Sequence, residues 1–109
     1  MEVNRALLLE RLAGQAKAAL LARRGLPSSA EFVELVQLER KHQDEKWGKQ
    51  DRSLAMWVTI LAEEFGEFAQ AACDLEDGRA TDVEHAIHEL ASVGAVAQSI
   101  FEQYFRREP

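Results

Sequence analysis

Residues 54–76, LAMWVTILAEEFGEFAQAACDLE, carry the clearest structural pattern in the chain, because their apolar side chains recur at helical intervals. On a helical wheel, six of them fall within an arc of roughly 80°. Its members are Trp57, Leu61, Phe65, Phe68, Ala72 and Leu75. Glu64 falls inside or at the edge of this stripe, where a carboxylate without a partner or metal would be costly. The stretch predicts an amphipathic helix that ends at Asp77-Gly78.

Turn and capping signals on either side of this stretch predict three further helices. They are expected at about residues 3–24, 28–47 and 81–106. Ser28 and Thr81 each precede a glutamate by three positions, which is the capping box that opens a helix. Ala, Leu, Glu, Gln and Arg dominate the chain, and these residue types favour helices over strands. The sequence therefore predicts an all-α fold, a bundle of four helices.

The last predicted helix carries an apolar face that is wide for so short a chain. One face holds Val83, Ile87, Leu90, Gly94, Ala97 and Phe101, and Val93, Val96, Ile100 and Tyr104 widen it. The 109 residues fit one domain, with an additional helix in residues 1–27 and a core in residues 28–109. Because a domain of this size cannot bury so much apolar surface alone, we expect at least a homodimer through the third and fourth helices.

The charge balance limits the possible partners. The net charge of −6 argues against binding to a nucleic-acid backbone or an anionic membrane. A phosphate ligand would need a divalent cation to offset its repulsion from this acidic chain. Cys73 is the only cysteine and lies in a segment that indicates a buried helix, which suits a reducing compartment. The N-terminal apolar run is too short for a signal sequence or a membrane span, so we expect a cytoplasmic protein.

Acidic residues on two predicted helices form a candidate metal site. Glu63, Glu64 and Glu67 make an E-E-x-x-E array, and Glu64 and Glu67 occupy neighbouring positions on one helical face. Glu89 follows on the next helix of an expected antiparallel hairpin. Carboxylate oxygens that converge from two helices are ligands that Mg²⁺ takes, with water and substrate phosphates completing its octahedron. The alternative is a solvated helix face, and the position of Glu64 in the apolar stripe makes the metal site an equally good interpretation.

Two segments of the chain resemble a known family. Residues 39–50 read ERKHQDEKWGKQ and residues 57–67 read WVTILAEEFGE. Together they resemble the MazG-like nucleoside triphosphate pyrophosphohydrolases, over roughly residues 36–102. That family is all-α, and its mark is E-E-x-x-E followed downstream by E-x-x-D. Residues 1–30 have no recognisable counterpart in it.

The resemblance implies hydrolysis of the α–β phosphate bond of a nucleoside triphosphate, which gives the monophosphate and pyrophosphate. It implies that Glu64, Glu67 and Glu89 bind Mg²⁺, or Mn²⁺ in its place. Glu63 would be a catalytic carboxylate that holds a further metal or orients the attacking water. One position departs from the family, because Ser92 stands where the second motif has aspartate. The alternative is therefore a non-catalytic helical module that binds nucleotide or a protein partner.

Side chains near the junction of the second and third predicted helices are candidates for contact with the nucleotide. Lys46, Lys49 and Arg52 would reach its phosphates, and Trp47 would stack against its base. The alternative for each cation is a solvated surface side chain. Trp57, on the main apolar stripe, is expected in the core instead.

Overall fold

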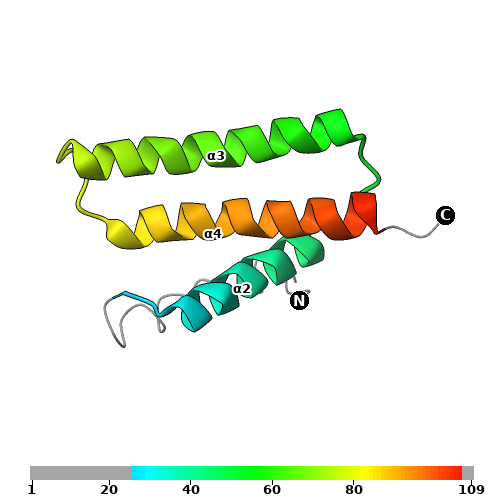
Figure 1. The fold of residues 1–109 in the computed structure, drawn as a ribbon, viewed down its shortest axis with the longest axis horizontal. Helices are drawn as coiled ribbons and strands as arrows, with labels where there is room; N and C mark the ends of the chain where they lie inside the picture. The colour runs from blue at the N-terminus through cyan, green and yellow to red at the C-terminus, as the bar shows by residue number, and fades with distance from the viewer. Residues whose placement is uncertain (1–25, 107–109) are drawn as a thin grey trace, which may run out of the picture. The chain divides into compact units, whose positions relative to one another are not determined.

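The computed structural model describes residues 26–106, which form three α-helices and one π-helical turn (Figure 1). No strand occurs among these residues, which confirms the all-α prediction for them. The chain divides into two compact units, Met1–Lys49 and Gln50–Pro109. The helix expected at residues 3–24 lies outside the described residues, so the four-helix bundle stays a prediction.

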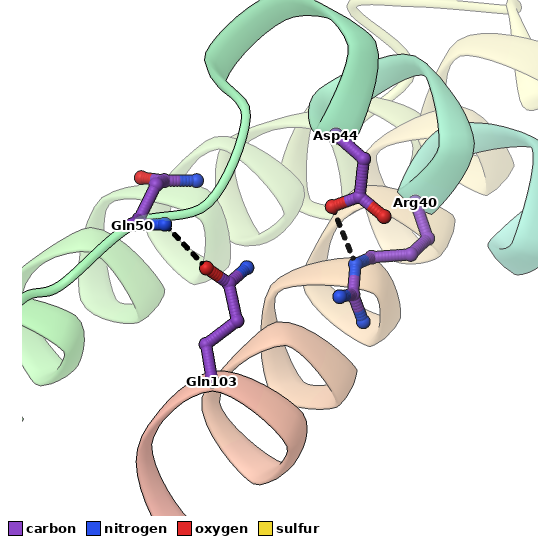
Figure 2. Close-up of polar contacts among 4 residues, drawn as sticks. All are labelled: Arg40, Asp44, Gln50 and Gln103. Atoms are coloured by element: carbon purple, nitrogen blue, oxygen red, sulfur yellow. Dashed lines mark hydrogen bonds and ion pairs between the residues drawn. The ribbon is translucent and has the colours of Figure 1, made fainter. Parts of the chain in front are cut away.

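The first unit contains helix α2, Ser29–Trp47. Ser28 makes the predicted capping box, because its Oγ accepts a hydrogen bond from the backbone N–H of Glu31 at 3.2 Å. The backbone N–H of Ser28 donates in return to Glu31 Oε1 at 3.1 Å. Farther along the helix, Arg40 Nε donates to Asp44 Oδ1 at 2.9 Å (Figure 2). The helix ends at Gly48, whose φ of 70° costs glycine little.

The second unit begins with helix α3, Leu54–Glu76, which covers the residues of the predicted amphipathic helix. Ser53 caps its N-terminus, since Ser53 Oγ accepts a hydrogen bond from the backbone N–H of Met56 at 3.1 Å. Gly78 follows its last turn with a φ of 76°, a conformation that glycine tolerates. The expected end of the helix at this glycine is confirmed.

Helix α4, Val83–Ile100, begins one residue later than predicted from a cap at Thr81. The cap is Asp82 rather than Thr81, because Asp82 Oδ1 accepts a hydrogen bond from the backbone N–H of His85 at 3.0 Å. Aspartate is at least as good a cap as threonine, so the adjacent residue can take the role. Beyond α4 the chain continues as the π-helical turn Phe101–Phe105, close to the predicted end.

Helices α3 and α4 run side by side in opposite directions (Figure 1). Trp57 is buried as predicted, with 2% of its surface exposed. The buried face of α4 differs from the prediction, because it consists of smaller residues: Ala86, Ala91, Ser92, Ala95, Val96 and Ser99. Several of the larger residues on the predicted apolar faces are exposed in the single chain, namely Phe65, Val83, Leu90 and Phe101. The larger apolar residues of the predicted face are thus not covered within the single chain, and their burial by a second copy stays a prediction.

Cys73 is exposed on α3 rather than buried, since its alanine neighbours in the sequence point to other sides of the helix. No helix in the described part of the chain is long and apolar enough to cross a membrane.

Candidate metal centre

Three glutamates converge on one side of the α3–α4 hairpin. Glu64 and Glu67 lie on α3 and Glu89 on α4, and one carboxylate oxygen of each lies within 4.8 Å of the other two. The spacing of three residues places Glu64 and Glu67 beside each other on α3. The antiparallel neighbour then brings Glu89 to them. The structure thus brings together the three residues that the sequence selected as metal ligands.

The three carboxylates differ in burial. Glu64 and Glu89 are half-buried, whereas Glu67 is exposed. The side chain of Glu89 is 13% exposed, and the Nε2 atom of His85 lies 3.8 Å from the Oε1 atom of Glu89. This contact is an ion pair only when the imidazole is protonated. A cluster with one exposed and two shielded carboxylates has a solvent-facing side from which an ion or a substrate can enter.

Two residues of the cluster, Glu67 and Glu89, line a groove of about 480 Å³, a volume within the usual range for small-molecule sites. Its polar lining comes from both helices and the α4 cap: Glu67, Gln70, Asp74, Asp82, His85 and Glu89. Four of these six residues, Gln70, Asp74, Asp82 and His85, were not predicted as site residues from the sequence. Helical periodicity would have found them, because Gln70 and Asp74 follow Glu67 at i+3 and i+7, and His85 and Asp82 precede Glu89 by four and seven residues.

The other predicted site residues lie outside this cluster. Glu63 is exposed on α3 and is not among the three converging carboxylates. Lys46, Trp47 and Lys49 are exposed and belong to the first unit, where Lys46 Nζ lies 5.1 Å from the centre of the Trp47 ring. Arg52 is half-buried and belongs to the second unit. The role of each in catalysis or substrate binding stays a prediction.

Ser92 occupies a buried position on α4, one turn after Glu89, with 5% of its surface exposed. The i+3 spacing places it next to Glu89 on the helix surface. Its hydroxyl is a neutral oxygen, and it stands where the E-x-x-D motif of the resemblance has a carboxylate. Among residues 26–106, the carboxylates that converge here are therefore those of the three glutamates.

The donor set fits a small, hard divalent cation. Mg²⁺ binds oxygen at about 2.0–2.1 Å, so ligand atoms on opposite sides of the ion lie about 4.2 Å apart. Three ligands of one octahedron include adjacent pairs, which lie about 3 Å apart, so the carboxylate oxygens, which lie within 4.8 Å of one another, would move closer together around an ion. Three protein ligands would leave octahedral positions for water or phosphate oxygens. Comparison with family models, curated proteins and solved structures finds no match for this chain.

Proposed function

We propose that this protein hydrolyses a nucleoside triphosphate to the monophosphate and pyrophosphate in a reaction that depends on Mg²⁺. The observation that carries the proposal is the convergence of Glu64, Glu67 and Glu89 from two helices, beside a groove that Glu67 and Glu89 line. The order of these residues in the sequence also resembles the MazG-like family, which performs this reaction. A triphosphate would otherwise be repelled by a chain of net charge −6.

In this proposal each glutamate has a separate task. Glu64 and Glu89, which are half-buried, hold the ion in a fixed position, and Glu67 binds it from the solvent side. A bound Mg²⁺ or Mn²⁺ neutralises the triphosphate oxygens and stabilises the charge that develops during phosphoryl transfer. Glu63 orients the attacking water from the exposed side of α3. Lys46, Lys49 and Arg52 bind phosphate oxygens, and Trp47 stacks on the base.

We also propose that the protein is a homodimer formed through α3 and α4. An apolar groove on the hairpin supports this, lined by Phe68, Ala72, Leu75, Glu76, Val83, Ala86, Ile87 and Leu90. Large apolar side chains that line a groove favour burial by a second copy. A sedimentation mass near 12 kDa at micromolar concentration would contradict the dimer. A cytoplasmic location suits this chemistry and the exposed free thiol of Cys73.

The alternative function is a helical module that binds nucleotide or a protein partner without turnover. The observation that favours it is Ser92, which leaves the cluster without a fourth carboxylate. With fewer charged ligands, an ion would be held more weakly and the triphosphate less well neutralised. Binding of nucleotide without release of pyrophosphate is the result that this alternative expects.

A panel of common and modified nucleoside triphosphates separates the two functions. Each compound is incubated with the protein and either Mg²⁺ or Mn²⁺, and released pyrophosphate is measured against a control with chelator. Hydrolysis predicts stoichiometric pyrophosphate and monophosphate from at least one compound, and no release with chelator. Absence of release from every compound, together with measurable nucleotide binding, would favour the non-catalytic module.

A further inference from the structure

A chain of hydrogen bonds links the beginning and the end of the second unit. Gln103, in the π-helical turn, accepts a hydrogen bond at its Oε1 from the backbone N–H of Gln50 at 2.6 Å (Figure 2). The side chain of Gln50 in turn accepts at its Oε1 a hydrogen bond from Arg52 Nε, also at 2.6 Å. Gln103 therefore fixes the backbone of Gln50, and Gln50 fixes the guanidinium of Arg52.

The guanidinium of Arg52 is held on a second side by an aromatic ring. Its Cζ lies 5.8 Å from the centre of the buried Trp57 ring, within the range of a cation–π contact. Within the described residues, no carboxylate lies at ion-pair distance from Arg52, although the chain is acidic. Its Nε is occupied, and the two terminal nitrogens are the donors that remain for a ligand. A half-buried guanidinium that is oriented but not neutralised by a protein carboxylate is suited to an external oxyanion.

The position of Arg52 relates this oxyanion site to the glutamate cluster. Trp57, beneath the guanidinium, and Glu64 are separated by two turns of α3 and lie on the same face of that helix. Two turns correspond to about 10 Å along the helix axis. An ion at Glu64 and a guanidinium over Trp57 would therefore be separated by a distance that a metal-bound polyphosphate chain, hydrogen-bonded to the guanidinium, can span.

We propose that Arg52 binds the terminal phosphate of the triphosphate, and that Gln50 and Gln103 are positioning residues for its guanidinium. The assignment to the terminal phosphate rests on the proposed function, whereas binding of a polyphosphate anion does not. π-Helical turns occur often at functional sites, and this one presents the side chain that begins the hydrogen-bond chain. Gln103 lies outside every motif in the sequence, so only the structure connects it to Arg52.

The test measures binding of inorganic tripolyphosphate with Mg²⁺, which requires no hydrolysis. Calorimetry gives the affinity, and the ¹H–¹⁵N resonance of the Arg52 Nε–H group reports contact at the guanidinium itself. Arg52→Gln should weaken binding about tenfold or more, because a charge-assisted contact is lost. Gln103→Ala should weaken binding by about fivefold and broaden the Nε–H resonance, because Gln50 is released. Gln103→Glu keeps an acceptor for the Gln50 N–H and should retain the narrow resonance.

Circular dichroism melting of each variant checks that the helices remain folded. An Nε–H resonance that does not respond to tripolyphosphate, or an Arg52→Gln variant with wild-type affinity, would overturn the oxyanion site. Wild-type affinity and an unchanged resonance in Gln103→Ala would overturn the positioning role. If the wild-type protein binds tripolyphosphate through Arg52 but hydrolyses no triphosphate, the oxyanion site is confirmed and the proposed hydrolysis is wrong.

Discussion

Glu64 on α3 and Glu89 on α4 bring one carboxylate oxygen each to within 4.8 Å of the other. Two like charges at that separation repel each other by about 3 kcal/mol at an effective dielectric constant of about 20. Both side chains are half-buried, so solvent screens this repulsion only in part. A divalent cation between them replaces repulsion by attraction. The stability of the hairpin should therefore depend on divalent cations.

We expect Mg²⁺ to raise the melting temperature of the wild-type protein. At a concentration a hundredfold above Kd, a ligand that binds only the folded state stabilises it by about 2.7 kcal/mol. In a domain of this size that corresponds to a rise of roughly 10 °C. Glu89→Gln should remove most of this rise, whereas Glu76→Gln, also on the hairpin but outside the cluster, should keep it. An equal rise in both variants would locate the binding site elsewhere.

Ser92→Asp tests the departure from the E-x-x-D motif. The position is buried, so a carboxylate introduced there should lower the melting temperature measured in chelator. Because position 92 lies one turn from Glu89, the new carboxylate should join the cluster and increase the stabilisation by Mg²⁺. Scanning calorimetry with chelator and with Mg²⁺ measures both effects. A variant with unchanged stability in chelator would contradict the burial of this position.

The start of α4 provides a test of the fold that does not involve catalysis. Asp82→Ala removes the acceptor for the His85 N–H and should lower the free energy of unfolding by about 1 kcal/mol. Thr81→Ala is the matched control, and it should change this free energy by only a few tenths of that amount. Urea titration in chelator gives both values without a contribution from bound metal. A larger loss of unfolding free energy in Thr81→Ala than in Asp82→Ala would indicate that Thr81 is the cap.

Alanine substitutions of Trp57 and Phe65 test which residues of the apolar stripe on α3 belong to the core. Trp57→Ala should cost about 3–5 kcal/mol of unfolding free energy, because the whole side chain is buried. Phe65 lies on the same predicted stripe but is 58% exposed, so Phe65→Ala should cost much less. Urea titrations at the same protein concentration compare the two variants. Similar losses would mean that Phe65 is covered in solution, as a second copy of the chain would do.

Local features of this fold could be predicted from the sequence, and features that depend on tertiary packing could not. The capping box of Ser28 was predicted because its partners lie within one helical turn. The buried face of α4 was not, because Ala91 and Ala95 contribute little to an apolar pattern yet allow close packing. The contact between Gln50 and Gln103 joins opposite ends of the second unit, and no periodicity indicates it.

The candidate site likewise has parts that the sequence predicts and parts that depend on tertiary packing. The E-E-x-x-E spacing predicted the pairing of Glu64 with Glu67, and the expectation of an antiparallel hairpin added Glu89. The groove beside them depends on the register between the two helices, which the sequence alone does not specify. The predicted contacts of Lys46 with the nucleotide concern the first unit and stay a prediction.

The most direct test of the central claim is the release of pyrophosphate by Glu64→Gln compared with the wild-type protein. The substitution keeps the shape and helix propensity of the side chain and removes the charge that binds the cation. With Mg²⁺ and the best triphosphate of the panel, we predict wild-type turnover and a fall in kcat/KM of about a thousandfold or more in the variant. The melting temperature in chelator should be unchanged or higher, since carboxylate repulsion is relieved. Pyrophosphate release by Glu64→Gln at the wild-type rate would contradict the account.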